Sequence, residues 1–572
     1  MSSLRVALCQ ADTVVGAFIH NVDKICEFLK KAGEEGAELA VFPELALSSY
    51  PPLDLLDRPG FLEASQKALE DLAARAGQLP KAPQTIVLGS IVKNPDATGR
   101  AIQNAAVVIH QGKIVHIQPK RLLPTYDVFD EHRYFEPGQA TQPWNSPWGK
   151  MGLSVCEDAW FEDTHMGRRF YREDPALALK GCDFVINVSA SPFEINKRTR
   201  RKQQVAGFVK RIGAPLIYVN QVGANDEILF DGGSLVCAST GDAIYEMPSF
   251  REAISILNFD PKAGGQVSNS VGWIWQSTDT GSGHWEKQLV PATVQSEIEL
   301  LHKGLVTGIR DYFRKTGFKR AVIGLSGGID SAVVASLAAE ALGPNHILGV
   351  AMPSQYSSSH SLTDAEALAK AIGIEYRVLS IKFMFTSLLM ELKPAFLGAP
   401  PDATEENIQA RLRGVLLMAL ANKRQGLVLT TGNKSELAVG YCTTYGDMAG
   451  ALGPIGDVYK TRVYELARYI NTKHHWIPES TLTKAPSAEL RPNQTDQDSL
   501  PAYDVLDRLL EAHFEGSADE PELVKAGFDV ELVRRILSLV RTSEFKRRQA
   551  APVIKTTSKA FGLGRRIPVA KA

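Results

Sequence analysis

The chain has 572 residues, with a hydrophobic fraction of 44%, a charged fraction of 22% and a formal net charge of −1. This length is too great for one hydrophobic core and predicts several domains, while the composition is ordinary for a globular protein. The balanced charge offers no basic surface for nucleic acid, and no apolar stretch approaches the roughly 18 residues that span a bilayer. We therefore expect neither nucleic acid nor a membrane among the partners.

The cysteines and the first residues predict the compartment. Six cysteines are scattered along the chain with no Cys-x-x-Cys pair, so we expect neither a zinc ribbon nor a disulfide framework. Residues 1–10 run straight into a strand pattern, without the charged and then apolar segments of an export signal. Both features predict a cytoplasmic location.

The first half of the chain mixes strand and helix patterns. A helical spacing covers residues 21–31, and Gln111-Gly112 marks the turn of a hairpin. Strands interleaved with helices and hairpins predict a layered α/β sandwich. We expect the strands at residues 4–10, 37–44, 84–93, 151–156, 182–189 and 216–220, and the hairpin at residues 101–119.

Three polar residues follow expected strands of this half, where sites on α/β scaffolds usually lie. Glu44 ends VFPE, Lys120 ends HIQPK, and Cys156 lies in SVCEDAW. Each has an ordinary alternative, because a lone strand cysteine is most often a small buried hydrophobe. Glu44 and Lys120 could likewise be solvated strand ends or members of a structural ion pair.

Together the three residues and their flanks resemble the Glu-Lys-Cys triad of the nitrilase family of amidases. The resemblance implies an αββα sandwich, in which Cys156 attacks an amide and Lys120 stabilises its thiolate. Glu44 would serve as general base and then acid, supported by Glu131. Lys120 and the backbone N–H of Glu157 would hold the oxyanion. The matching flanks are FPEL at 42–45, PKRLLPTYDVFDEHRYFEPG at 119–138 and CEDAW at 156–160.

A glutamine pocket is expected beside this triad. Small hydroxyls and a cation would suit the ammonium and carboxylate of free glutamine, and the sequence does not choose between Lys197 and Arg198. The basic run at 197–202 has an ordinary alternative as a solvated helix face. The resemblance adds Tyr126 and Glu157 to this pocket. The expected pocket residues are Tyr126, Glu157, Ser189, Ser191, Lys197 and Arg198.

Residues 261–293 show no clear strand or helix pattern. They are rich in Gly, Ser and Thr, which predicts a connecting segment. Helical order returns at residues 295–315, where Ser296 and Glu299 have the spacing of a capping box. We therefore divide the chain into an amidase domain at 1–262, a linker at 263–294 and a second domain at 295–572.

The second domain is organised around a glycine-rich turn, Ser326-Gly327-Gly328-Ile329-Asp330-Ser331. It lies between an expected strand at 321–325 and an expected helix at 332–342, which is the geometry of a phosphate cradle. The lysine of the common nucleotide-binding loop is absent, and Asp330 beside a polyphosphate implies Mg²⁺ between them. An ordinary strand–helix turn is the alternative. Further strands at 347–352, 375–379 and 426–431 predict a doubly wound parallel sheet.

This turn resembles the SGGxDS signature of the ATP-pyrophosphatase group, which has an adenine nucleotide alpha-hydrolase-like fold. The whole second half resembles NAD⁺ synthetases, and the full chain resembles their glutamine-dependent form. The motifs that carry this resemblance are TTGNKSE at 430–436, YGD at 445–447, GDVYK at 456–460, PSAEL at 486–490 and RPNQTDQDSLPAYDVLD at 491–507.

The resemblance assigns roles position by position. Asp330 and Glu436 would hold Mg²⁺, and Lys460 would bind the ATP phosphates, although a lone lysine is usually a surface residue. The expected ATP-binding residues are Ser326, Gly327, Gly328, Ile329, Asp330, Ser331, Thr431, Lys460, Lys484 and Ser487. The expected residues for the deamidated dinucleotide are Asn407, Arg411, Glu436 and Asp447.

The implied function is glutamine-dependent NAD⁺ synthesis from ATP, deamido-NAD and L-glutamine, through an adenylylated intermediate, by a homo-oligomer of at least two copies. Ammonia is mostly protonated in water, so a fused producer and consumer predict an apolar tunnel from Cys156 toward Asp447. Rivals are a tRNA-thiolating or GMP-forming synthetase and a nucleotide-binding sensor with an inactive amidase half. Thiolation favours paired cysteines, yet the second half holds only Cys442.

Overall fold

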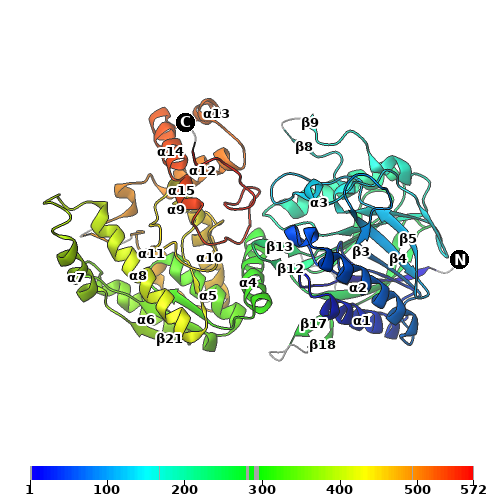
Figure 1. Cartoon of the computed structure of the whole chain (residues 1–572), viewed down its shortest axis with the longest axis horizontal. Coiled ribbons are helices and arrows are strands. Elements are labelled where there is room, and N and C mark those ends of the chain that lie inside the picture. Colours follow the sequence, from blue (N-terminus) through cyan, green and yellow to red (C-terminus); the bar gives the residue numbers. More distant parts are fainter. Residues whose placement is uncertain are drawn as a thin grey trace. The chain divides into compact units, whose positions relative to one another are not determined.

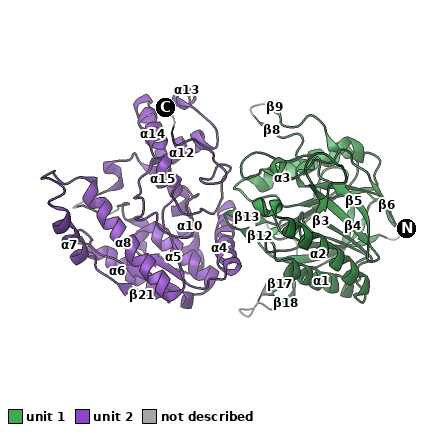
Figure 2. Ribbon diagram, viewed as in Figure 1, with its two compact units in different colours: residues 1–295 green, residues 296–572 purple. Residues whose placement is uncertain are grey.

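The structure is a computed structural model that describes residues 3–165, 168–277, 283–288, 295–487, 489–491 and 494–570. The chain forms two compact units, Met1–Gln295 and Ser296–Ala572 (Figure 2). The finer division at 262/263 and 294/295 stays a prediction. Among the residues described, no helix is long and apolar enough to cross a membrane.

The first unit contains two large sheets (Figure 1). One has the order β18-β17-β16-β1-β2-β3-β4-β5, and the other has the order β15-β14-β11-β10-β7-β6. The strands of the first sheet are β1 (Leu4–Gln10), β2 (Leu39–Val41), β3 (Thr85–Lys93), β4 (Ile102–His110), β5 (Lys113–Pro119), β16 (Ala253–Asp260), β17 (Gln266–Ser277) and β18 (Gly283–Gln288). Those of the second are β6 (Trp144–Ser146), β7 (Gly149–Val155), β10 (Phe184–Ser189), β11 (Leu216–Asn220), β14 (Leu235–Cys237) and β15 (Ala243–Glu246).

The residues of β1 show how this sandwich is held together. Successive strand residues point to opposite faces, and both faces of β1 are buried. Val6 and Leu8 pack with Leu153 of the second sheet in a core between the sheets, so the two sheets lie face to face. Ala7 and Cys9 belong to another core, beneath the helices. Burial on both faces explains why the strand is a nearly continuous apolar run.

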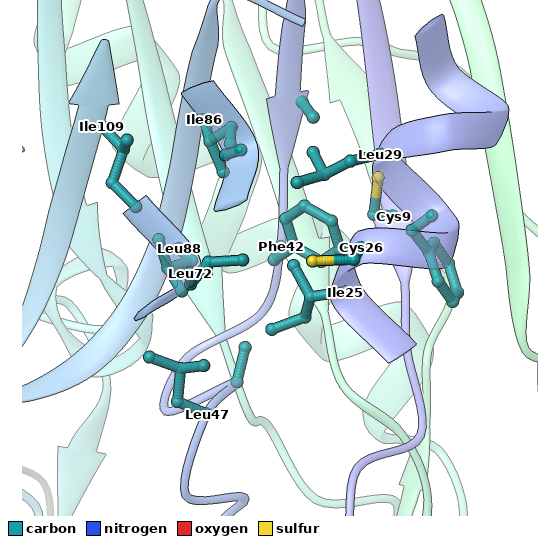
Figure 3. Packing of buried hydrophobic residues seen from close by; sticks show 14 of the residues in the cluster. Cys9, Ile25, Cys26, Leu29, Phe42, Leu47, Leu72, Ile86, Leu88 and Ile109 are labelled. Carbon is teal, nitrogen blue, oxygen red and sulfur yellow. The ribbon is translucent and has the colours of Figure 1, made fainter. Parts of the chain in front are cut away.

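Helices cover the outer faces of both sheets. Figure 3 shows Cys26 and Leu29 of α1 (Phe18–Glu34) beside Phe42, which follows β2. Ile25 of α1 and Ile86 of β3 belong to the same core. Each such side chain, when fully buried, stabilises the fold by roughly 1.5–3 kcal/mol. The other covering helices are α2 (Pro59–Gln78), which shares this core, and α3 (Lys197–Ile212), which packs on the second sheet. The predicted αββα sandwich is confirmed.

The predicted hairpin is also confirmed, as β4 and β5 pair antiparallel. Gln111 and Gly112 both have positive φ, at 50° and 75°, as a tight hairpin turn requires. Two smaller ribbons pair β8 (Thr164–His165) with β9 (Arg168–Arg169), and β12 (Val222–Asn225) with β13 (Ile228–Asp231).

The expectation of an irregular segment over 261–293 is wrong for the part that the structure describes. β17 pairs with β16, and β18 pairs with β17, so both strands extend the first sheet. Trp273 and Trp285 pack against the core under α1, while Gly and Ser residues between them hid the alternation. Residues 278–282 and 289–294 lie outside the described residues.

The second unit is built on a four-stranded parallel sheet of order β21-β20-β19-β22. Its strands are β19 (Ala321–Gly324), β20 (Ile347–Ala351), β21 (Glu375–Val378) and β22 (Leu427–Leu429). The strand order reverses at β19, whose neighbours β20 and β22 lie on opposite sides. Ligands on such sheets bind at the carboxyl ends of the strands beside this reversal. The predicted doubly wound sheet is confirmed.

Helices surround this sheet and continue after it. The helix predicted at 295–315 is α4, and its N-cap Ser296 accepts a hydrogen bond from Glu299 N at 3.3 Å. The helices are α4 (Glu297–Thr316), α5 (Ile329–Leu342), α6 (Ser359–Ile372), α7 (Lys382–Leu392), α8 (Ala403–Arg424), α9 (Lys434–Val439), α10 (Lys460–Lys473), α11 (Glu479–Thr483), α12 (Tyr503–Phe514), α13 (Glu520–Lys525), α14 (Val530–Thr542) and α15 (Glu544–Arg547).

Candidate active sites

The first site is a buried ion cluster at the ends of β2 and β5. Lys120 Nζ donates to Glu44 Oε1 at 2.7 Å and to Glu131 Oε1 at 2.8 Å. Exposure is 1% or less for Glu44 and Lys120 and 4% for Glu131. A lone buried charge would be very costly, so the two carboxylates and the ammonium depend on one another. Tyr50 completes the cluster by donating to Glu131 Oε1 at 2.8 Å.

Neighbouring groups fix the Glu44 carboxylate. Asn104 Nδ2 donates to Oε1 at 2.6 Å, and the Ala190 backbone N–H donates to Oε2 at 2.9 Å. A Cβ at Gly89 would lie 2.4 Å from the Glu44 Cα, so only glycine allows this close approach. Glu44 is therefore held in one orientation, as a general base must be.

Cys156 lies at the turn between β7 and the short 3₁₀ helix η3 (Cys156–Ala159), with a φ of 40°. A positive φ is strained for a side chain of this kind, and such strain is typical of catalytic turns. Asp158 braces the turn, because Oδ2 accepts from Val155 N and Oδ1 accepts from the N–H groups of Arg121 and Leu122. One carboxylate thus joins the segment that carries Lys120 to the turn that carries Cys156.

Charge around Cys156 decides its resting state. Burial raises the pKa of the thiol well above its usual range, and Glu44 adds to that rise, while Lys120 opposes it. Burial disfavours the Lys120 ammonium, but Glu131 and Glu44 outweigh it and raise the pKa of Lys120. The resting pair is therefore a neutral thiol beside a charged lysine. The expected stabilisation of the thiolate by Lys120 is present but too small to ionise the cysteine.

Glu157 adds a further carboxylate next to Cys156 in the chain. Tyr126 Oη donates to its Oε1 at 2.9 Å, and Tyr171 Oη donates to the same oxygen at 2.7 Å. Burial raises the pKa of Glu157 to about 7 despite these donors. The structure therefore brings together the predicted Tyr126 and Glu157. Tyr171 was missed, because nothing in its flanks distinguishes it.

The other predicted glutamine residues are placed as follows. Ser189 Oγ donates to Asn187 Oδ1 at 2.6 Å, and Ser191 N donates to Asn220 Oδ1 at 2.8 Å. Both serines follow or end β10 and are buried.

Two cations of α3 were candidates for the glutamine carboxylate. Lys197 Nζ lies 5.6 Å from the ring centroid of Trp160. Trp160 follows Cys156 closely in the sequence. Arg198 Nε instead donates to Glu246 Oε1 at 2.7 Å. Arg198 is therefore already paired with a carboxylate of the protein, and which of the two cations receives glutamine stays open.

The second site is a cavity of about 300 Å³ at the carboxyl ends of β19 and β22. Gly327 at its rim has a φ of 77°, and a Cβ there would lie 2.3 Å from the Ser361 carbonyl oxygen. The turn at Ser326–Ser331 therefore needs glycine. The predicted residues that line this cavity are Ser326, Gly327, Gly328, Ile329, Asp330, Ser331, Thr431, Glu436, Asp447, Lys460, Lys484 and Ser487.

Two carboxylates converge on one lysine in this cavity. Lys460 Nζ donates to Asp330 Oδ2 at 2.5 Å and to Glu436 Oε1 at 3.2 Å. Burial raises the pKa of Glu436 to about 8, with Asp330 adding to the rise and Lys460 opposing it. Asn433 Nδ2 holds the other Asp330 oxygen at 2.9 Å.

These carboxylates fit a hard divalent cation, since both already face one cation, Lys460, and carboxylate oxygens are the ligands that such an ion prefers. No group of three or more His, Cys, Asp or Glu side chains that could hold a metal was found within the described ranges. A magnesium ion on Asp330 and Glu436 would therefore need further oxygen ligands, which ATP phosphates could supply.

Two predicted residues do not line this cavity. Asn407 Oδ1 accepts from Thr443 Oγ1 at 2.8 Å, and Arg411 Nε donates to the Thr444 carbonyl at 3.3 Å. Both lie on α8 and hold the segment before Asp447.

Three charged lining residues were missed from the sequence: Arg413, Glu489 and Asp496. Arg413 lies two residues beyond Arg411, and Glu489 and Asp496 lie inside motifs that were noted as wholes. Arg413 lies three residues after Ala410, another lining residue, so the two share a helix face.

Comparisons with known proteins match a family to each half of the chain. The family described as carbon-nitrogen hydrolase matches residues 5–268, and the family described as NAD synthase matches residues 301–550. The glutamine-dependent NAD(+) synthetase of Synechocystis sp. is 44% identical over 572 residues, which cover 99% of this chain and 98% of that protein. The chain belongs to the glutamine-dependent NAD(+) synthetase family.

Other members of the glutamine-dependent NAD(+) synthetase family are similar over their full length. The Thermotoga maritima protein is 41% identical, with coverage of 100% of this chain and 99% of that protein. The Acinetobacter baumannii synthetase, solved in complex with ADP, is 36% identical with a TM-score of 0.74, covering 99% and 98%. The Cytophaga hutchinsonii synthetase, at 20% identity and a TM-score of 0.78, covers 100% and 98% and shares the fold.

Membership of this family makes the chain an enzyme, a ligase with a nitrilase-type domain and an NAD synthase domain. Sequence identities of 44% and 41% to glutamine-dependent NAD(+) synthetases, over nearly the full length, disfavour the tRNA-thiolating, GMP-forming and sensor alternatives.

Proposed function

We propose that the enzyme amidates deamido-NAD to NAD⁺, using ATP for activation and glutamine for nitrogen, with release of AMP and pyrophosphate. The observation that carries this proposal is the meeting of Asp330, Glu436 and Lys460 in a cavity lined by the glycine-rich turn. The buried cluster of Glu44, Lys120 and Cys156 supports the glutamine half.

In the glutaminase step, Glu44 takes the proton of the Cys156 thiol as the sulfur attacks the amide carbon. The Lys120 ammonium and the Glu157 N–H stabilise the oxyanion. Collapse breaks the C–N bond, and Glu44 returns the proton so that ammonia leaves and a thioester remains. Water then hydrolyses the thioester with Glu44 as base, which releases glutamate.

In the synthetase step, a carboxylate oxygen of deamido-NAD attacks the α-phosphorus of ATP, and the bond to the β-phosphate oxygen breaks. The N–H groups of the glycine-rich turn and the Lys460 ammonium neutralise the departing pyrophosphate. Asp330 and Glu436 would hold a magnesium ion, which supplies further charge neutralisation. Ammonia then attacks the acyl carbon, and AMP leaves with one former carboxylate oxygen.

The products test this proposal directly. Purified full-length enzyme is incubated with ATP, glutamine and deamido-NAD, and the nucleotides are identified by mass. AMP and NAD⁺ in equal amounts support the proposal, while ADP with phosphate would show that ATP is cleaved at the other bond.

The pH dependence of glutamine binding is the first prediction. If Glu157 binds the ammonium of glutamine, only its carboxylate form binds well, and its pKa is about 7. We expect the KM for glutamine to rise as the pH falls through 7, by about tenfold per pH unit well below that value. Glu157→Gln should raise the KM and flatten this profile, and a flat wild-type profile would remove Glu157 from this role.

Channelling of ammonia is the second prediction, and the tunnel from Cys156 toward Asp447 stays a prediction. Ammonium has no lone pair to attack an acyl adenylate, so a closed apolar path would keep ammonia reactive. Unlabelled glutamine is supplied with excess ¹⁵N-ammonium, and the label in NAD⁺ is measured by mass. Channelling predicts far less label than the bulk ratio, after correction for the direct ammonium reaction, whereas label at the bulk ratio would contradict it.

The homo-oligomer is also a proposal, with a second copy of this chain packing on α7 and α8. Phe383 and Met390 of α7 are 84% and 71% exposed, and Val415 of α8 is 63% exposed. Large exposed apolar side chains on neighbouring helices are typical of subunit contacts. Sedimentation velocity of the full chain measures its mass, and a monomer at micromolar concentration would contradict the proposal.

A further inference from the structure

The motif at residues 491–507 contributes a helix end that the proposed chemistry does not use. Its last residue, Asp507, lies on α12 and is 4% exposed. Tyr503 lies one turn earlier, and its ring centroid is 5.3 Å from Lys460 Nζ. Both residues therefore belong to the face of α12 that packs against the start of α10.

The Asp507 carboxylate connects two helices that carry site residues. Its Oδ1 accepts a hydrogen bond from Ser435 Oγ, and its Oδ2 accepts one from Thr461 N at 2.8 Å. Ser435 Oγ in turn accepts from the Lys460 backbone N–H at 2.9 Å. Ser435 immediately precedes Glu436 on α9, and Lys460 begins α10.

The first turn of α10 explains why these acceptors are needed. A helix leaves its first four N–H groups without partners inside the helix, and a polar N-cap side chain usually accepts one of them. The N-cap here is Tyr459, whose side chain makes no capping hydrogen bond. Ser435 and Asp507 accept from the first two N–H groups instead. The start of α10 is thus fixed by α9 and α12, and not by its own cap.

We propose that Asp507 is a positioning residue that holds the Lys460 ammonium in register with the Glu436 carboxylate for binding of the ATP polyphosphate. This inference rests on the proposed role of Lys460 at the ATP phosphates. Without Asp507, Ser435 loses the acceptor that orients its hydroxyl, and the first turn of α10 loses an acceptor. Lys460 then shifts relative to Glu436, although neither of their side chains has changed.

A double-mutant cycle tests this proposal against a merely structural brace between the three helices. The variants are Asp507→Asn, Lys460→Ala and the double variant, all as the full chain. The readout is the affinity for magnesium α,β-methylene-ATP by calorimetry, which needs no turnover. Asn keeps the size of Asp but offers one acceptor oxygen to two donors.

We expect Asp507→Asn to weaken binding about tenfold, because small displacements of a charged binding group are costly. In the Lys460→Ala background, Asp507→Asn should add less than about a twofold further loss, because the group that it positions is gone. An equal loss in both backgrounds would show a brace that acts independently of Lys460, and would overturn the proposal.

Asp504→Asn is the matched control, since Asp504 lies on the exposed face of the same helix, and it should bind the analogue like the wild type. If Asp507→Asn does not fold, as judged by its thermal unfolding, Ser435→Ala takes its place in the cycle, with the same outcomes. If Lys460→Ala binds the analogue as tightly as the wild type, the proposed phosphate role of Lys460 is wrong. The positioning role of Asp507 would then be wrong as well. This result differs from equal losses in both backgrounds, which would contradict the role of Asp507 alone.

Discussion

Replacing Cys156 with alanine is expected to abolish glutamine-driven synthesis of NAD⁺ while synthesis from added ammonium continues. The alanine lacks the sulfur that forms the thioester, and none of the described hydrogen-bond partners of Glu44 and Lys120 is a cysteine. The second site needs only free ammonia, so its chemistry should not depend on Cys156. Both activities are measured as NAD⁺ formed from deamido-NAD and ATP.

Cys182→Ala is the matched control, because Cys182 is also a buried cysteine of the first unit but belongs to the core under α3. It should retain both activities apart from a modest loss of stability. Loss of both activities in a folded Cys156→Ala protein would contradict the assignment of Cys156 to a separate amidase.

Replacing Asp330 with asparagine should lower turnover by at least about 10²-fold with either nitrogen source, which is typical of removing one preorganised electrostatic group. The change keeps the shape of the side chain but removes one of the two charges that face Lys460. The site would then neutralise the departing pyrophosphate less well, because a divalent cation would lose a ligand. Initial rates are measured with glutamine and, separately, with ammonium.

The control for this change is Asp529→Asn, because Asp529 caps α14, does not line the second cavity, and is replaced by another capping side chain. Its rates should match those of the wild type. Near-normal turnover of Asp330→Asn at ordinary magnesium concentrations would show that Asp330 is not part of the ATP site. A loss confined to the glutamine reaction would show that Asp330 acts in the glutaminase step and not in synthesis.

Sequence patterns pointed to the candidate site residues themselves, but not to the residues that orient them by hydrogen bonds. Glu44, Lys120 and Cys156 were singled out because each ends or follows an expected strand, and Asp330 because it lies in a glycine-rich turn before a helix. Asn104 and Asp158, which orient Glu44 and the Cys156 turn, escaped notice. Their partners come from remote segments or from the backbone, and no local pattern encodes such pairings.

The same limit explains the error in the fold, and why the sequence did not predict the resting state of the cysteine. β17 and β18 were taken for a linker, because strand pairing with a sheet formed elsewhere in the chain overrode a local pattern rich in Gly and Ser. The neutral thiol of Cys156 follows from its burial and from Glu44, and burial depends on the assembled sandwich.

The fate of the carboxylate oxygens tests the central claim most directly. Deamido-NAD labelled with ¹⁸O in its nicotinate carboxylate is supplied with ATP and glutamine, and the masses of AMP, pyrophosphate and NAD⁺ are measured. Activation by adenylylation predicts one ¹⁸O in each AMP, one in each NAD⁺ and none in pyrophosphate, because the acyl–oxygen bond breaks when ammonia displaces AMP. Label in inorganic phosphate, with ADP as the nucleotide product, would contradict the account.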